Sequence, residues 1–176
     1  MNIEQIKIAV AEAAKRFGAE EYELTISDRE ETGVEALKKE VSAVSYSRSG
    51  SMVVRCVVGG KSGYAASELV TPEAAAQIVE TACENATIVD DADQVGLFPG
   101  SAHYETSKDT AIVLPDTDAL KERALQLQEL AYAASDKIID GTQSFVSGMN
   151  IIQDVMNSAG LQLHYETGLV YQGLMA

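Results

Sequence analysis

The chain has few of the residues on which nucleic-acid binding and metal binding usually depend. Its 176 residues include two histidines and two cysteines, and 13 lysines and arginines stand against 27 acidic residues. The net charge is −14, and the basic residues are scattered along the chain. Because phosphate contacts require clustered lysine and arginine, we expect no direct nucleic-acid partner.

Signals for membrane insertion or secretion are also lacking. No apolar run reaches the roughly 18 residues that a membrane span needs. The N-terminal stretch, MNIEQIKIAVAEAAKRFG, has no basic leader followed by an apolar core, so we expect a cytoplasmic protein without a membrane partner. Cys56 and Cys83 lie in apolar segments and are expected to be buried free thiols, with a disulfide as the alternative.

Three helices are predicted from the spacing of apolar residues and from capping residues. Asn2 can cap the start of the first helix and Gly18 can close its end. A threonine, a proline and a glutamate begin the second helix, and a periodic apolar face marks the third. The predicted helices cover residues 3–17, 71–87 and 117–136.

The other regular segments have strand composition. Before the second helix they are YELTISDRE, VSAVSYS, MVVRCVV and KSGYAAS, and Gly59-Gly60 indicates a hairpin turn between the last two. ETGVEALKKE is compatible with a strand or a helix, and we favour a strand. After the third helix come GTQSFVSG, MNIIQDVM, LQLHYE and GLVYQGLM, with a turn at residues 157–160 between the middle pair.

This order of segments predicts an α+β fold with mostly antiparallel sheet and three main helices. Residues 88–115 are expected to be irregular. We predict a single domain over residues 1–176, with possible lobes at 1–95 and 100–176. Because the last residues still have strand composition, we expect the chain to be part of a longer protein.

The tetrapeptide His-Tyr-Glu-Thr occurs twice, and each copy contains one of the two histidines, His103 and His164. On a strand, the histidine and the glutamate of one copy would point to the same face and could bind a metal. The flanking sequences differ, however, and zinc sites usually need three or four ligands in recognisable spacing. We therefore interpret the repeat as a coincidence.

Other candidate sites have simpler structural interpretations. GGKSG resembles a phosphate loop, but it lies at a predicted hairpin turn and not between a strand and a helix. Arg55 is interpreted as an outward-facing strand residue, with a substrate or partner contact as the alternative, and Tyr64 as a core or rim aromatic. The acidic loop at residues 90–93 lacks EF-hand spacing. We predict no catalytic, cofactor-binding or metal-binding residue in this chain.

The run SRSGSMVVRCVVGGKSGYAASELVTPEAAAQIVETACENA resembles the N-terminal domain of the TldD/PmbA family. A second similarity lies in VMNSAGLQLHYETGLVYQGLMA, which matches the family's hairpin pattern v-x-N-S-x-G. The segments GKSGYAASE and NSAGLQLHYETG are closer to the PmbA (TldE) branch than to TldD. The matching positions are Gly50, Val54, Arg55, Cys56, residues 59–61, residues 63–67, the helix from Pro72, Val155, Asn157, Ser158 and Gly160.

The resemblance implies the first domain of a two-domain protein. The family includes zinc-dependent peptidases whose HExxxH helix lies in the following domain, and no position here matches that motif. Zinc is therefore expected only in the remainder of a full-length protein or in a partner. The PmbA branch typically lacks the metal motif and pairs with a TldD-like subunit, and the family is associated with proteolysis, peptide maturation and the label of DNA gyrase modulator.

Two functions from different classes remain open. In the first, the chain is the leading domain of a metallopeptidase-family protein and shapes a substrate chamber or a subunit interface, with a peptide as substrate. In the second, it is a non-enzymatic oligomerisation domain that acts as a regulatory subunit. Its partner would be another copy of the chain or a TldD-like subunit, and an exposed strand edge could also recruit an extended peptide.

Overall fold

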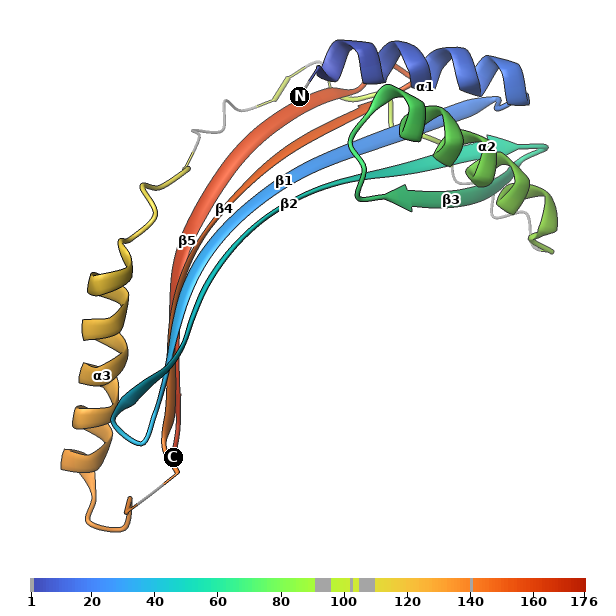
Figure 1. Ribbon diagram of the computed structural model, residues 1–176. Helices are drawn as coiled ribbons and strands as arrows, with labels where there is room; N and C mark the ends of the chain where they lie inside the picture. Colours follow the sequence, from blue (N-terminus) through green and yellow to red (C-terminus); the bar gives the residue numbers. More distant parts are fainter. Residues whose placement is uncertain (1, 91–95, 102, 105–109, 140) are drawn as a thin grey trace. The chain divides into compact units, whose positions relative to one another are not determined.

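The computed structural model describes residues 2–90, 96–101, 103–104, 110–139 and 141–176. Over these residues the chain has the predicted α+β fold, with three helices and one five-stranded antiparallel sheet (Figure 1). The strand order in the sheet is β3-β2-β1-β4-β5. None of the described helices is long and apolar enough to cross a membrane.

The three helices confirm the predictions from spacing and caps. They are α1 (Ile3–Phe17), α2 (Pro72–Ile88) and α3 (Thr117–Ala134). The Asn2 side chain accepts the Gln5 N–H at 3.3 Å at the start of α1, and Gly18 ends that helix in the left-handed conformation with φ 74°. The Thr71 hydroxyl accepts the Ala74 N–H at 3.2 Å at the start of α2.

The strands are fewer and longer than predicted. They are β1 (Glu21–Leu37), β2 (Glu40–Val58), β3 (Lys61–Ser67), β4 (Gln143–Asn157) and β5 (Gln162–Met175). The segments that were expected to interrupt strands at Gly50, Gly148 and Gly168 continue them instead. The ambiguous ETGVEALKKE segment is strand as far as Leu37, as favoured, and then turns at Lys38 and Lys39.

These glycines allow other segments to approach the sheet closely. A Cβ atom at Gly50 would lie 2.9 Å from Val70 Cγ2, and one at Gly148 would lie 2.6 Å from Pro115 Cδ. Such distances leave no room for a side chain, so glycine is needed there without a turn. The prediction of strand breaks at these positions was wrong because glycine occurs both in turns and within strands on which another segment packs closely.

The chain forms two compact units, each with its own core. The first unit contains residues 1–28, 49–108 and 152–165, and the second contains residues 29–48, 109–151 and 166–176. In the first unit, α1 and α2 pack together, and their apolar faces contact alternate residues of β1 and β2 such as Leu24 and Val54. In the second unit, α3 contributes to a smaller core of Val34, Ala36, Leu120, Ala124 and Val146.

Candidate binding site

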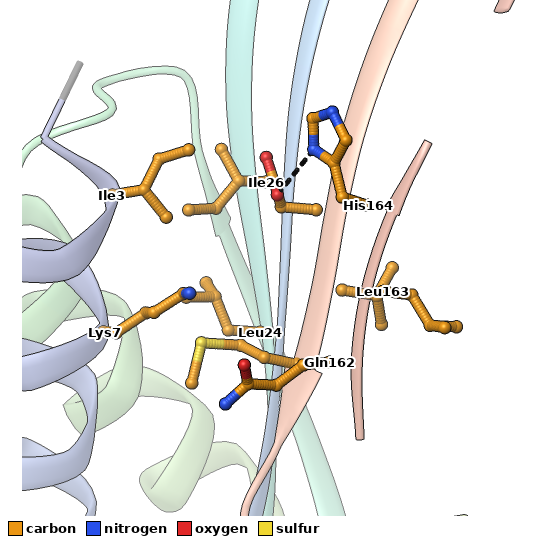
Figure 2. A pocket seen from close by; sticks show the side chains of 10 residues that line it. Ile3, Lys7, Leu24, Ile26, Gln162, Leu163 and His164 are labelled. Carbon is orange, nitrogen blue, oxygen red and sulfur yellow. Dashed lines mark hydrogen bonds and ion pairs between the residues drawn. The ribbon is translucent and has the colours of Figure 1, made fainter. Parts of the chain in front are cut away.

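The first unit contains a pocket beside the N-terminal half of α1. Its volume is about 240 Å³, which suits a single amino-acid side chain better than a drug-sized ligand. Figure 2 shows side chains of α1 and of the strands facing one another across it. The lining residues come from α1, β1, β4 and β5, and they are Ile3, Lys7, Leu24, Ile26, Asp154, Val155, Met156, Gln162, Leu163 and His164.

The floor of the pocket is apolar. Leu24 and Ile26 are alternate residues of β1, so their side chains lie on the same face of the sheet, and both are buried. Met156 packs against the same core from β4. Ile3, from the first turn of α1, is the fourth apolar contributor. An apolar ligand group placed here would leave water for a preformed apolar surface.

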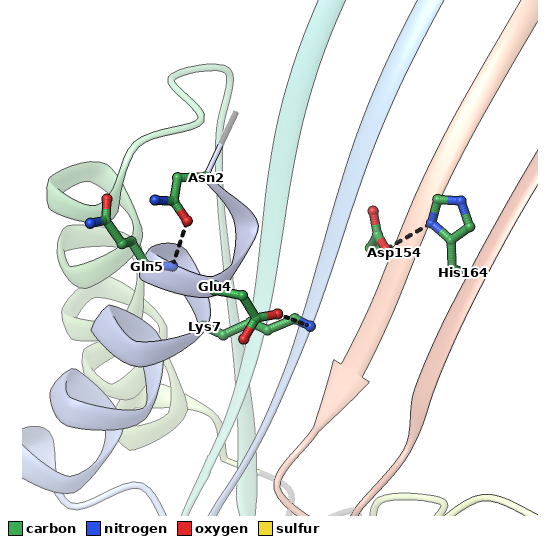
Figure 3. A network of polar contacts seen from close by, with 6 residues as sticks. All are labelled: Asn2, Glu4, Gln5, Lys7, Asp154 and His164. Carbon is green, nitrogen blue, oxygen red and sulfur yellow. Dashed lines mark hydrogen bonds and ion pairs between the residues drawn. The ribbon is translucent and has the colours of Figure 1, made fainter.

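One rim of the pocket carries a histidine–carboxylate pair. His164 Nδ1 lies 2.9 Å from Asp154 Oδ1, and the two residues stand on the neighbouring strands β5 and β4 (Figure 3). The Asp154 side chain is 19% exposed and the His164 side chain is 50% exposed. Hydrogen bonding of Nδ1 to the carboxylate fixes the orientation of the imidazole ring. The pair therefore gives this rim of the pocket a polar group of fixed orientation.

Across the pocket, α1 supplies a positive charge. Lys7 Nζ lies 2.8 Å from Glu4 Oε1, one turn earlier on the same helix (Figure 3). The Glu4 side chain is 77% exposed, whereas the Lys7 side chain is 24% exposed. Exposed ion pairs of this kind contribute about 0–1 kcal/mol, so Glu4 can exchange readily for a carboxylate of a ligand.

The pocket has the features of a binding site rather than a catalytic one. A histidine–aspartate pair can act in nucleophilic catalysis when a serine or cysteine lies beside the histidine. No hydroxyl or thiol side chain belongs to the described residues that line the pocket. The arrangement can therefore orient and hold a ligand through an apolar floor and two polar rims.

The glycine turn of GGKSG is occupied by a side chain of the protein itself. Gly59 and Gly60 have φ values of 58° and 75° and form the two-residue turn between β2 and β3. Their N–H groups donate to the two carboxylate oxygens of Glu20, at 3.2 Å and 3.3 Å. The turn interpretation is confirmed, and an internal carboxylate fills the position that a phosphate would need.

Arg55 pairs with β3 on the sheet face opposite the core of the first unit. Its cross-strand neighbour is Tyr64, whose ring centre lies 6.0 Å from the guanidinium carbon. Its Nη2 and Nε groups also donate to the Ser62 hydroxyl, at 2.9 Å and 3.1 Å. Arg55 thus faces away from the core as interpreted, and these contacts hold it across the hairpin.

The two histidines do not share a site. His164 stands on β5 and lines the pocket, whereas His103 lies outside the helices and strands and is not among the lining residues. Glu105 and Thr106 of the first tetrapeptide lie outside the described residues, as do residues 91–93 of the acidic loop. Among the residues that the structure describes, no group of three or more histidine, cysteine or acidic side chains could hold a metal ion.

Cys56 and Cys83 are buried free thiols, as predicted. Cys56 is on β2 and Cys83 is on α2, and both belong to the core of the first unit. Burial, together with a smaller effect of the neighbouring Cys83, raises the pKa of the Cys56 thiol to about 12. Burial also raises the pKa of Cys83, against a smaller lowering by its hydrogen bond with Cys56. Both groups are therefore protonated and poorly nucleophilic at neutral pH.

Sequence reasoning considered only one polar residue of the pocket as a possible ligand-binding group. His164 was considered as a metal ligand, but Lys7 and Asp154 were not singled out. The lining residues are spread over three distant segments, so no local spacing could have indicated them. The alternation of Asp154 and Met156 on one strand face is a weak signal, because many half-buried strands show it.

Comparison with known proteins shows which domains this chain is similar to. It is an α+β domain built on a five-stranded antiparallel sheet. Residues 22–86 match the family description "PmbA/TldA metallopeptidase domain 1". The match covers the part of the chain between the start of β1 and the end of α2, so this part is similar to a first domain of that family. No curated protein matches the sequence.

Solved structures share the fold over nearly the whole chain. TldE from Thermococcus kodakarensis is 22% identical, with a TM-score of 0.76, and the match covers 96% of this chain and 38% of that one. A proposed modulator of a DNA gyrase from Thermotoga maritima is 15% identical, with a TM-score of 0.73 and coverage of 98% and 42%. A second such protein, from Bacteroides thetaiotaomicron, is 14% identical, with a TM-score of 0.76 and coverage of 98% and 40%. The chain thus spans about two fifths of the length of these solved relatives.

Proposed function

We propose that this chain is the N-terminal, non-catalytic domain of a longer cytoplasmic protein of the PmbA (TldE) branch, and that its pocket holds one side chain of an extended peptide. The family match over residues 22–86 and the greater length of the solved relatives support the first part. Any zinc ion and the peptide-bond chemistry would then come from the remainder of the protein or from a TldD-like partner.

The observation that carries the peptide part is the combination of an apolar floor with polar groups on two rims. The partly exposed Ile3 and Met156, which lie beside the buried Leu24 and Ile26, offer an apolar surface for an aliphatic side chain. His164, held by Asp154, gives one rim a polar group of fixed orientation. Lys7 can bind a carbonyl or carboxylate oxygen on the opposite rim. Peptides combine these apolar and polar groups within a few ångströms of each other.

The test is calorimetric titration of the chain with two blocked pentapeptides that differ only in a central leucine or aspartate. We expect measurable binding of the leucine peptide and none of the aspartate peptide, because the floor cannot solvate a carboxylate. In the variant His164→Gln, the leucine peptide should bind about five- to tenfold more weakly, because the substitution removes the histidine–aspartate pair that forms one rim of the pocket.

His103→Gln is the matched control, because it removes the other histidine without touching the pocket. This variant should bind the leucine peptide like the unmodified chain. Equal binding of both peptides, or equal effects of the two histidine substitutions, would contradict the proposed role of the pocket. The family assignment would survive either result, because it does not depend on the pocket.

A second candidate function, a non-enzymatic interaction domain, is favoured by a different observation. Residues 40–49 of β2 are all exposed, although they belong to a strand. Extended edges of this kind commonly receive another strand. A chain that only assembles with other subunits would use this edge and would not require the pocket.

A further inference from the structure

The β2 segment from Glu40 to Arg48 is an open edge of the sheet among the described residues. β3 pairs with β2 only between Met52 and Val58, so it does not reach this segment. β1 is the neighbour on the other side. The backbone N–H and C=O groups that point away from β1 are therefore available to another strand over residues 40–48.

The sequence of this edge favours strand pairing. EVSAVSYSR is rich in valine, serine and tyrosine and contains no proline, glycine or lysine. Natural sheets usually protect such edges with proline, lysine, bulges or a covering loop. On β5, at the opposite edge of the sheet, Thr110 pairs with the strand at one point: its N–H donates to the Glu166 carbonyl at 3.0 Å, and the Gly168 N–H donates to the Thr110 carbonyl at 3.0 Å.

A second copy of the chain fits this edge by symmetry. A two-fold axis perpendicular to the sheet makes two identical edges antiparallel and keeps each face of the sheet on the same side. When the axis passes through Val44, this residue lies opposite its own equivalent. Glu40 then lies opposite Arg48 of the partner subunit, and the reverse contact occurs at the other end.

We propose that residues 40–48 of β2 pair antiparallel with the same residues of a second copy, in the register centred on Val44. This pairing gives the second candidate function a defined surface and partner. It does not depend on the peptide pocket, which belongs to the first unit. In the dimer, the two β2 strands would lie side by side, and the sheets of the two copies would form one continuous sheet.

The charges select this arrangement over its alternatives. A parallel in-register pair would place Glu40 opposite Glu40 and Arg48 opposite Arg48, and like charges directly opposite are destabilising. A shift of the two-fold axis by one residue removes the opposite-charge contacts. Arg48 also interacts within its own chain, so a contact with Glu40 of the partner subunit would replace an existing interaction and add little binding energy. The charges therefore determine the register, and the main-chain hydrogen bonds supply most of the attraction.

The first test compares two valine-to-lysine substitutions by sedimentation velocity over a concentration series. Val44→Lys places two lysines opposite each other at the axis, whereas Val41→Lys places a lysine opposite a serine. Both valines are exposed, at 52% and 36%, so both variants should fold. We expect the unmodified chain to dimerise, Val44→Lys to weaken the dimer about tenfold or more, and Val41→Lys to have less than about a threefold effect.

Charge reversal tests the register. Glu40→Arg alone and Arg48→Glu alone each place like charges opposite at both ends and should weaken the dimer about tenfold. The double variant Glu40→Arg with Arg48→Glu restores opposite charges and should recover most of the affinity. Circular dichroism of each variant separates a folding defect from a loss of pairing.

Cross-linking gives a readout that does not depend on affinity. With Val44→Cys, two thiols meet across the axis, and mild oxidation should produce a disulfide-linked dimer. With Ala43→Cys the equivalent thiols are offset, and cross-linking should be several-fold weaker. The native thiols are buried in the core and serve as an internal background. A chain that stays monomeric, or a dimer that is indifferent to Val44→Lys and to the position of the cysteine, would overturn the proposal.

Discussion

The side chain of Gln128 accepts a hydrogen bond from the backbone N–H of Lys39, which lies 89 positions earlier in the sequence. Its Nε2 group donates to the carbonyl oxygens of Ala36 and Thr142, at 2.6 Å and 3.1 Å. Gln128 is fully buried in α3. A single glutamine thus satisfies three backbone groups where the β1–β2 turn meets β4.

Gln128→Leu should destabilise the second unit strongly. The leucine fills a similar volume but leaves a buried N–H and two carbonyl groups with fewer partners, at about 2–4 kcal/mol in total. Chemical denaturation followed by circular dichroism measures the change. Gln126→Leu, an exposed position on the same helix, is the control and should change the unfolding free energy by less than about 0.5 kcal/mol. Similar effects at both positions would show that the buried contacts are unimportant.

Gly63 lies against α2 so closely that no side chain can replace its hydrogen. A Cβ atom there would be 2.0 Å from the Ala82 carbonyl oxygen and 2.3 Å from the Ala86 nitrogen. Gly63→Ala must therefore displace the helix from β3, and we expect a loss of about 3 kcal/mol or more in unfolding free energy. Thermal unfolding of each variant measures the change. Gly96→Ala, with open space around its Cβ position, is the control and should be close to neutral.

The acid stability of the second unit should depend on Tyr171. Its hydroxyl donates to Glu31 Oε1 at 2.5 Å and is the main cause that lowers the pKa of Glu31, with Arg29 acting in the same direction against burial. A lowered carboxyl pKa contributes stability above the unfolded value of 4.5, and this is lost as the pH falls through the folded pKa.

Tyr171→Phe should therefore reduce the unfolding free energy by about 1 kcal/mol at pH 7, with the difference from the unmodified chain disappearing in acid. Urea unfolding between pH 7 and pH 2 provides the measurement. A difference that persists unchanged at the lowest pH would point to lost packing against Phe145, whose ring centre lies 6.1 Å from that of Tyr171.

The buried thiols should make the first unit sensitive to alkali. The pKa of Cys56 rises from 9.0 to about 12 in the folded state, so its contribution to stability is complete below pH 9 and declines as the pH rises from 9 to 12. The decline approaches about 1.4 kcal/mol per pH unit in that window. Cys56→Ala removes this term, so its unfolding free energy should fall less steeply above pH 9 than that of the unmodified chain.

Sequence reasoning succeeded where the signals are local. The caps at Asn2, Gly18 and Thr71 lie within one helical turn of the groups that they satisfy, and the helix boundaries followed from them. The turn at Gly59-Gly60 is similarly local, since both residues need positive φ. Each of these features needs only a few neighbouring residues to be recognised.

The missed features depend on contacts between distant segments. Gly148 continues a strand because Pro115 packs on it, and nothing in the residues beside Gly148 indicates that contact. Gln128 interrupts the apolar stripe of α3, and its burial makes sense only when Lys39 and Thr142 are brought to it. The pocket has the same origin, because Lys7 and Asp154 come to line one cavity only in the folded chain.

The Asn157-Ser158 turn carries a consequence for the chemical lifetime of the protein. Asparagine side chains are lost over time when the next backbone nitrogen attacks the amide carbon, and an asparagine–serine pair in a flexible chain is prone to this reaction. Here the Asn157 amide accepts the N–H groups of Ala159 and Leu161 at 3.0 Å and 3.1 Å and donates to the Phe98 carbonyl at 2.8 Å. The attacking nitrogen, that of Ser158, is itself bound to the Tyr22 carbonyl at 2.9 Å. The rate at which the Asn157 side-chain amide is lost therefore measures how often the turn opens. The folded state protects this asparagine from the reaction.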